Sequence, residues 1–153
     1  MLCPFCREKD TSVVDSRPCE EGTAVRRRRL CTCNGGMRFT TFERIQFQEL
    51  SVIKSNSKRE PFDRDKVSKS IRIATRKRPI GIDALDNFVS KIVMKIEGLG
   101  ESEVPTSTIG KFIMEGLQYM DTVAYVRYAS VYKNFKEAKD FEQFVGSLDE
   151  KKS

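Results

Sequence analysis

Hydrophobic and polar positions follow two different periods along the chain, and the change falls near residue 50. Before it, β-branched and polar residues alternate over short extended segments, which predicts three strands. After it, a short hairpin is followed by apolar residues spaced three and four apart, which predicts helices. The pattern therefore predicts an α+β protein: a small three-stranded ribbon, then a mainly helical domain with a short β-hairpin. The predicted strands cover residues 11–16, 23–29 and 38–44, and the hairpin covers 50–54 and 58–62.

Four helices are expected after the hairpin, and a final short helix with a frayed tail follows Lys136. Asp63, Asp83 and Asp121 precede three of the helices, where an aspartate can accept hydrogen bonds from the free N–H groups of the first turn. The other helix opens at Pro105. The predicted inward faces are Val67, Ile71 and Ala74; Leu85, Phe88, Val89, Ile92 and Ile96; Ile109, Phe112, Ile113, Leu117 and Met120; and Ala124, Tyr128, Val131 and Phe135.

All five cysteines precede residue 34, and four of them form two close pairs, Cys3 with Cys6 and Cys31 with Cys33. Two such pairs are typical of a structural zinc site, and a chain without histidine must build that site from cysteines alone. Cys31 and Cys33 are separated by one residue instead of two, so Cys19 stays an alternative fourth ligand. A disulfide, a redox pair or free thiols are further alternatives, but nothing suggests secretion.

Metal is expected to stabilise the ribbon, because some forty residues bury too little apolar surface to fold alone. The 153 residues contain no signal peptide and no apolar run of membrane-spanning length, so a cytoplasmic protein is expected. An enzyme is not expected, because the chain lacks a glycine-rich phosphate loop, clustered carboxylates and histidine. A zinc with four protein ligands would also leave no open position for catalysis.

Charge is distributed unevenly. Residues 50–80 hold ten Lys/Arg against three Asp/Glu, residues 1–49 nine against seven, and residues 81–153 nine against twelve. Four consecutive arginines, Arg26 to Arg29, lie in the second predicted strand, and alternation sends them to both faces of the ribbon. The guanidinium fork suits phosphate and guanine, which predicts nucleic-acid binding. The alternative is a solvated strand or a protein contact.

Several motifs are distributed along the chain: Cys3-Pro4-Phe5-Cys6, Val14-Asp15-Ser16-Arg17, Arg26 to Arg29, Arg38-Phe39-Thr40-Thr41-Phe42-Glu43, Arg59-Glu60-Pro61-Phe62-Asp63, Lys77-Arg78-Pro79 and the segment from Val123 to Tyr132. Together they resemble the NrdR family, bacterial transcriptional repressors of ribonucleotide reductase genes. The resemblance covers roughly residues 1 to 145. It implies a zinc ribbon at 1–46 that binds paired operator boxes in double-stranded DNA, an ATP-cone at 49–139 that binds ATP or dATP as effector, and a C-terminal tail at 140–153. It also implies one zinc ion per chain, a homo-oligomer, and a cytoplasmic, nucleoid-associated protein.

The resemblance also implies roles for individual residues. Basic side chains of the cone would neutralise a triphosphate, and its tyrosines would stack on adenine, although both tyrosines could instead be ordinary core residues. The chain departs from the family pattern at Cys31-Thr32-Cys33, with a longer turn after it, and at Ser55-Asn56-Ser57. The implied DNA contacts are Arg17, Arg26, Arg27, Arg28 and Arg29, and the implied nucleotide contacts are Val52, Lys54, Arg59, Glu60, Phe62, Lys66, Tyr125 and Tyr132.

Two functional hypotheses follow. In the first, the nucleotide in the cone sets the oligomeric state and the DNA affinity of a repressor, with dATP favouring the DNA-binding form. In the alternative, the chain is an ATP-cone regulatory protein that binds ribonucleotide reductase directly. The arginines of the ribbon favour the first hypothesis.

Overall fold

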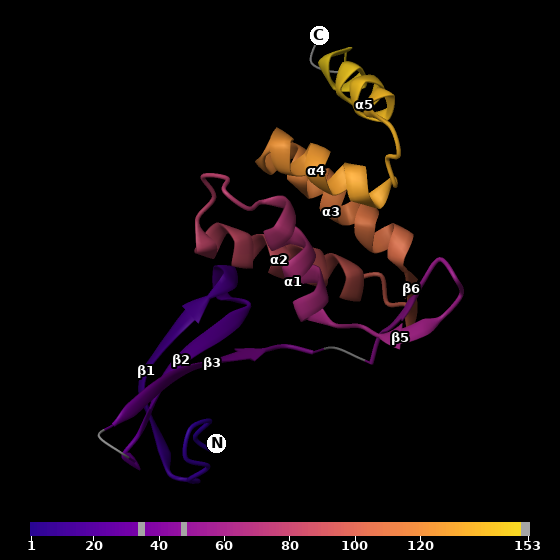
Figure 1. The fold of residues 1–153 in the computed structure, drawn as a ribbon. Coiled ribbons are helices and arrows are strands. Elements are labelled where there is room, and N and C mark those ends of the chain that lie inside the picture. Colours follow the sequence, from indigo (N-terminus) through magenta and orange to yellow (C-terminus); the bar gives the residue numbers. More distant parts are fainter. Residues whose placement is uncertain (34–35, 47–48, 151–153) are drawn as a thin grey trace. The chain divides into compact units, whose positions relative to one another are not determined.

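The computed structural model describes residues 1–33, 36–46 and 49–150, so the turn predicted after Cys33 lies partly outside the described residues. The chain divides into two compact units, Met1–Phe47 and Gln48–Ser153, called here the ribbon unit and the second unit. Each unit is described by itself. The mixed α+β class predicted from the sequence is confirmed (Figure 1).

The ribbon unit is an antiparallel sheet of three strands in the order β1-β2-β3. A 3-10 turn at Glu20–Gly22 joins the first two strands, and Gly22 adopts the left-handed conformation that glycine favours, with φ of 89°. The β1 strand carries a bulge between Val13 and Asp15, which shifts its register against β2. The strands are β1 (Thr11–Cys19), β2 (Ala24–Cys31) and β3 (Met37–Arg44).

The second unit contains the predicted hairpin, formed by β4 (Ser51–Ile53) and β5 (Arg59–Pro61). A third strand that the sequence did not predict, β6 (Glu103–Pro105), pairs in parallel with β4 and gives the order β5-β4-β6. This strand is only three residues long and ends in proline, and its partner lies some fifty residues earlier in the chain. Its local pattern was therefore too short to indicate a strand.

Within residues 49–150, five helices complete the second unit: α1 (Arg64–Ala74), α2 (Ile82–Glu97), α3 (Thr106–Met120), α4 (Thr122–Tyr132) and α5 (Ala138–Glu150). The helix α3 packs against both α2 and α4 (Figure 1). The most deeply buried large side chains come from four different elements and meet in one core. They are Ile71, Val89, Ile96, Val104, Ile113 and Leu117.

The predicted caps are correct at two helices and wrong at one. Asp63 accepts hydrogen bonds from the N–H groups of Asp65 and Lys66, and Asp121 accepts one from Ala124. The helix α2 begins two residues earlier than expected, with Gly81 as its N-cap, so Asp83 does not cap it. Asp83 lies instead in the first turn, where a negative charge complements the helix dipole.

The predicted inward face of α4 is partly wrong. Ala124 is buried as expected, but Val131 is 82% exposed, and Tyr125 and Ala129 are buried instead. The stripe was placed about one residue off because almost every side of α4 carries apolar or aromatic residues. The final short helix predicted after Lys136 is present as α5, and the ring centres of its Phe144 and of Tyr125 lie 5.4 Å apart. Residues 151–153, at the end of the predicted frayed tail, lie outside the described residues.

Two glycines in α3 allow aromatic rings to approach its backbone. A Cβ atom at Gly110 would lie 2.0 Å from the ring of Tyr132, and one at Gly116 would lie 2.2 Å from the ring of Phe88. Both distances are far below ordinary carbon–carbon contact, so each ring occupies the space that a side chain would need.

Candidate functional site

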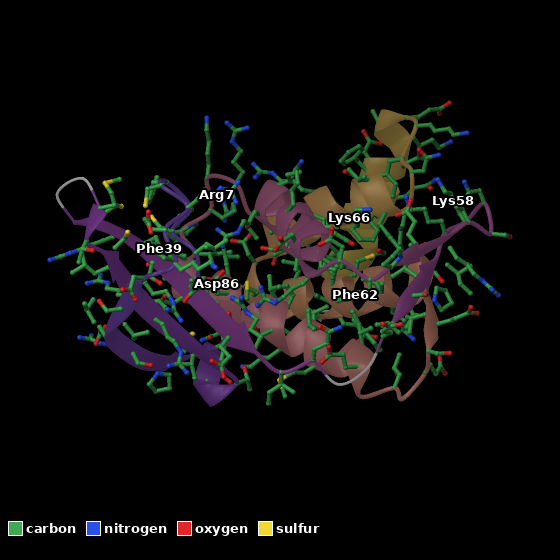
Figure 2. The ribbon with its side chains drawn as sticks, turned by 90° about the horizontal axis from the view of Figure 1, so that it is seen from below. Arg7, Phe39, Lys58, Phe62, Lys66 and Asp86 are labelled. Carbon is green, nitrogen blue, oxygen red and sulfur yellow. The ribbon has the colours of Figure 1, made fainter. Side chains whose placement is uncertain are left out.

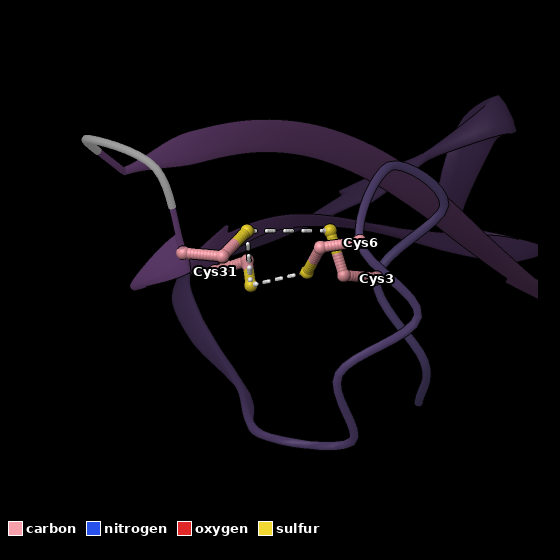
Figure 3. Close-up of side chains that lie close together, drawn as sticks. Cys3, Cys6 and Cys31 are labelled. Atoms are coloured by element: carbon pink, nitrogen blue, oxygen red, sulfur yellow. Dashed lines mark hydrogen bonds between the residues drawn. The ribbon is translucent and has the colours of Figure 1, made fainter.

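The four paired cysteines gather at one end of the ribbon unit (Figure 3). Their sulfur atoms all lie within 4.8 Å of one another. The Sγ atoms of Cys3 and Cys33 are 3.9 Å apart, and those of Cys6 and Cys31 are 3.6 Å apart. Cys3 and Cys31 are buried, whereas Cys6 and Cys33 are half-buried. Such a cluster joins the N-terminal loop to the far end of β2.

The loop that carries Cys3 and Cys6 is shaped to present sulfur atoms. The N–H of Arg7 donates to the carbonyl of Cys3 at 3.0 Å, and Arg7 adopts a left-handed conformation with φ of 64°. Burial opposes ionisation of Cys3, but the backbone N–H groups of Cys6 and Phe5 stabilise its thiolate, and the pKa of the Cys3 thiol falls to about 7. A readily ionised thiol suits metal binding, since the thiolate is the ligand.

The donor set fits zinc. Four thiolates at the usual zinc–sulfur bond length stand about 3.8 Å apart in a tetrahedron. The separations of 3.6 and 3.9 Å lie close to this value, whereas the Sγ atoms of Cys31 and Cys33, at 2.9 Å, are closer together. Four cysteine ligands are characteristic of structural zinc, which holds a small fold together and leaves no position for a substrate.

Cys19 does not belong to the cluster. It pairs with Ala24 at one end of the β1-β2 hairpin, whereas Cys31 pairs with Thr11 at the other end. Eight strand residues separate the two ends, which corresponds to about 26 Å. Cys19 is therefore excluded as the fourth ligand in this fold, and the structure brings Cys33 to the cluster.

The arginines of β2 alternate between the two faces of the ribbon. Arg28 is exposed, and Arg26, Arg27 and Arg29 are half-buried. The guanidinium group of Arg27 forms an ion pair with Glu43 at 3.0 Å, and that of Arg29 donates to the hydroxyl of Thr41 at 3.4 Å. Arg17, on β1, pairs with Asp15 at 3.1 Å, and its side chain is largely exposed.

A compact charged cluster lies on the hairpin of the second unit. The carboxylate of Glu60 accepts from Lys54 Nζ at 2.8 Å and from Lys66 Nζ at 3.0 Å. The two ammonium groups lower the pKa of Glu60 to about 2, and Glu60 in turn raises the pKa of Lys66. Val52 is the cross-strand partner of Glu60, and Phe62 packs against the core.

Figure 2 labels Phe62 and Lys66 in this region of the second unit. Arg59 lies at the start of β5 and pairs with Glu103 of β6 at 3.1 Å. Six of the residues implied for nucleotide binding thus come from the hairpin and from the start of α1. Lys54 and Lys66 are exposed at their positions, so both ammonium groups are open to an anionic ligand.

The remaining two residues implied for nucleotide binding, Tyr125 and Tyr132, line a cavity of about 440 Å³ between α3 and α4. A volume of this size lies within the range of small-molecule sites. The hydroxyl of Tyr132 donates to the carbonyl of Ser107 at 2.9 Å, and burial raises the pKa of Tyr125. The other lining residues are Ser107, Thr108, Lys111, Met114, Glu115, Gln118 and Lys133.

The strand β6 connects these two groups of residues. Its Pro105 pairs with Ile53 of β4, directly before Lys54, and α3 begins at the next residue, Thr106. The start of the cavity-lining helix is thereby placed beside the end of the hairpin strand. This connection was not predicted, because the pattern of residues 103–105 did not indicate a strand.

Two family models match the chain. Residues 1–43 match "Transcriptional repressor NrdR-like, N-terminal domain", and residues 50–138 match "ATP cone domain". The chain is 58% identical over 149 residues to "Transcriptional repressor NrdR" of Pelagibacter ubique, with 97% of each chain covered. The chain belongs to the NrdR family. Relatives with the same name from Dinoroseobacter shibae and Rhodospirillum centenum are 57% and 56% identical, covering 97% of this chain and 95% and 96% of their own lengths.

Membership of the NrdR family confirms the resemblance identified from the sequence and, with it, a zinc ribbon followed by an ATP-cone. The family is one of transcriptional repressors, so the prediction that the chain is not an enzyme is also confirmed. The cysteine cluster fits the zinc that such a ribbon holds. Across the residues that the structure describes, no helix combines the length and the apolar character needed to cross a bilayer.

The structure adds residues to the NrdR candidate site that sequence reasoning missed. Lys111 and Lys133 line the cavity beside the two tyrosines, and each contributes a positive charge there. Both lie outside the basic segment of residues 50–80, so the charge distribution along the sequence did not single them out. Their positions on α3 and just after α4 depend on how the two helices pack.

Proposed function

We propose that this chain represses ribonucleotide reductase genes by binding paired operator boxes through its zinc ribbon, with ATP or dATP in the cone setting its assembly and DNA affinity. The observation that carries the proposal is the combination, in one chain of the NrdR family, of an arginine-bearing ribbon closed by four cysteines with a cone that has a basic hairpin and a cavity.

One zinc ion per chain, held by Cys3, Cys6, Cys31 and Cys33, is the structural part of the proposal. The metal supplies the cohesion that the ribbon lacks in apolar core, since only Cys3, Ala24 and Cys31 among its described hydrophobic residues are buried. Side chains of the ribbon, and not the metal, contact the DNA. Arg17 and Arg26 to Arg29 provide guanidinium groups for phosphates and base edges.

In the nucleotide-binding part of the proposal, the residues of the hairpin and of α1 bind one part of the ligand, and the residues of the cavity between α3 and α4 bind the other. Lys54, Arg59 and Lys66 bind the phosphates, and Glu60 holds the two lysines in position until the triphosphate arrives. Val52 and Phe62 border this group, while Tyr125 and Tyr132 contact the adenine base from the cavity. The NrdR family is one of transcriptional repressors, so the nucleotide acts in this proposal as an effector and not as a substrate.

Assembly into a homo-oligomer is the third part, because paired operator boxes require two ribbons. Apolar side chains exposed on the helices of the second unit support it: Tyr119 is 91% exposed and Ile82 is 68% exposed. A nucleotide can shift assembly only if it binds one form more tightly than another. We propose that dATP favours the form that binds DNA, in a cytoplasmic, nucleoid-associated protein.

The experiment is retardation of a DNA fragment carrying the ribonucleotide reductase promoter from the same genome, with dATP, with ATP and with neither. Zinc content is measured in parallel for the wild type and for Cys33→Ser. Binding that depends on dATP, and is lost together with metal in the variant, is the expected result. A fragment that is never retarded, while nucleotide still binds, would favour direct regulation of the enzyme by the cone.

A further inference from the structure

The two faces of the ribbon differ in how their arginines are engaged. Residues paired across the strands share a face, so the register assigns every side chain of the sheet to one of two faces. One face, called here the open face, carries Arg26 and Arg28 of β2; the other, called the closed face, carries Arg27 and Arg29. The open face also holds Asp15, Arg17, Arg38, Thr40, Phe42 and Arg44, and the closed face also holds Val13, Ser16, Phe39, Thr41 and Glu43.

The bulge in β1 brings Arg17 to the open face. Val13 pairs with Arg29, but after the bulge Asp15 pairs with Arg28 and Arg17 with Arg26. Uninterrupted pairing from Val13 would set Arg17 opposite Val25, on the closed face, because a shift of one residue moves a side chain to the other side of a strand. The irregularity therefore concentrates arginines on a single face.

On the closed face, both arginines are already bound within the sheet. Arg27 pairs with Glu43, and Arg29 donates to the hydroxyls of Thr41 and Thr11 at 3.4 and 3.5 Å. An ion-paired or tethered guanidinium must give up these partners before it can bind phosphate. Binding of DNA to the closed face would therefore cost interactions that stabilise the sheet.

On the open face, three arginines have no carboxylate partner among residues 1–33, 36–46 and 49–148: Arg26, Arg28 and Arg38. Arg17 pairs with Asp15 on this face, but the side chain of Arg17 is 72% exposed against 34% for Arg27, so solvent screens the Arg17 pair and phosphate can replace Asp15 at little cost. Arg28 and Arg38 are exposed, and Phe42 is exposed beside them, with the guanidinium of Arg44 4.6 Å from its ring centre. Arg44 itself is held by Glu20. Unpaired guanidinium groups can bind the phosphates of a DNA duplex and the base edges in its grooves, and the exposed ring of Phe42 lies among them.

We infer that DNA binds across the open face alone, through Arg17, Arg26, Arg28, Arg38 and Phe42, and that Arg27 and Arg29 stabilise the sheet and do not contact DNA. The inference rests on the proposed function, since it assigns a surface to the DNA binding proposed above. It adds Arg38 and Phe42 to the contacts and removes two of the five arginines implied by the family resemblance.

The decisive comparison is Arg28→Gln against Arg29→Gln in the full chain. The two substitutions are adjacent, chemically identical and equal in net charge, so their long-range electrostatic effects on DNA are matched. DNA affinity is measured by fluorescence anisotropy with the promoter duplex and dATP between 50 and 200 mM salt. We expect Arg28→Gln to weaken binding about tenfold and to lower the slope of log affinity against log salt by about 1, and Arg29→Gln to leave the slope unchanged.

Zinc content and thermal unfolding show whether each variant folds. A second pair of variants tests the same inference if one of the first pair does not fold. Arg26→Gln is compared with the double variant Arg27→Gln/Glu43→Gln, which removes the ion pair of the closed face without changing the net charge of that face. Equal losses of affinity and slope from both faces, or a larger loss from the closed face, would overturn the inference while leaving the repressor function standing.

The proposed function fails separately. If the wild-type chain binds the promoter duplex no better than an unrelated duplex, sequence-specific repression is refuted. The face that contacts DNA is then still decided by the same variants on the unrelated duplex at 50 mM salt, where electrostatic contacts dominate binding.

Discussion

Replacing Gly110 with alanine should separate nucleotide binding from folding. The new Cβ would lie 2.0 Å from the ring of Tyr132, which is 38% exposed and can rotate away into solvent. In doing so the ring leaves the cavity between α3 and α4, and the hydrogen bond from Tyr132 to the carbonyl of Ser107 is broken. The substitution thus removes one wall of the proposed adenine site without touching the core.

The cost to stability should be small. Alanine favours a helix over glycine by about 1 kcal/mol. Against this, loss of the Tyr132 hydrogen bond costs about 1 kcal/mol, and uncovering roughly 40 Å² of the ring costs about 1 kcal/mol more. The free energy of unfolding should therefore fall by about 1 kcal/mol. Loss of aromatic stacking on adenine, worth about 1–3 kcal/mol, should weaken dATP binding about tenfold or more.

Gly116→Ala is the matched control on the same helix. Its Cβ would lie 2.2 Å from the ring of Phe88, which is buried in the core and cannot rotate outward. Overpacking there should destabilise the second unit by about 2 kcal/mol after the gain in helix propensity. Because Phe88 lies on α2, the cavity should be unaffected, and dATP should bind folded Gly116→Ala normally.

The assay is calorimetric titration of each full-length variant with dATP, together with chemical unfolding. Should Gly110→Ala bind dATP as tightly as the wild type does, Tyr132 is not part of the nucleotide site and the cavity has another role. A loss of affinity in both variants would point to a general effect of stability on binding, not to the displaced ring.

Three further predictions concern other parts of the chain. Lys54 and Lys66 hold the pKa of Glu60 at about 2, below its usual value near 4.5, so this cluster stabilises the fold above pH 4.5 and the contribution disappears as the pH falls toward 2. Unfolding curves of the wild type and Glu60→Gln should converge over that window, and a constant difference down to pH 2 would contradict the assignment. Removal of zinc by a chelator, or Cys31→Ser, should unfold the ribbon unit and abolish DNA binding while dATP still binds; retained DNA binding without metal would show that zinc does not stabilise the ribbon. Ile113 is 1% exposed in the core of the second unit, so Ile113→Ala should lower the free energy of unfolding by about 3 kcal/mol in urea titrations, and a loss below about 1 kcal/mol would mean that the core closes over the gap.

Local signals predicted much of the fold. The caps at Asp63 and Asp121 and the buried faces of α1 and α2 depend on residues within one or two turns of each other, so the sequence carries them directly. The same holds for the three ribbon strands, which are neighbours in the sequence. Non-local features were not predicted: β6 has only Val104 as an inward residue, and its pairing with β4 is visible only in three dimensions.

The candidate site shows the same division. Four cysteines at short spacings indicated a metal site, but only the strand register separates Cys19 from the cluster. The run of arginines indicated nucleic acid, yet the ion pair that distinguishes Arg27 from Arg28 is made by Glu43, sixteen residues after Arg27 in the chain. The cavity lies between two helices, so its lysines, Lys111 and Lys133, had no local signature.

Each end of the ribbon is held by its own cluster of side chains. The cysteine cluster closes one end, and at the other the carboxylate of Glu20 accepts hydrogen bonds from Arg44 at 3.0 and 3.2 Å. Between them, the open face carries side chains that contribute little to folding. Substitutions there should therefore change which DNA sequence is preferred without unfolding the protein. A repressor built in this way can change the DNA sequence that it prefers through single mutations that leave the cysteine cluster and the Glu20–Arg44 pair intact.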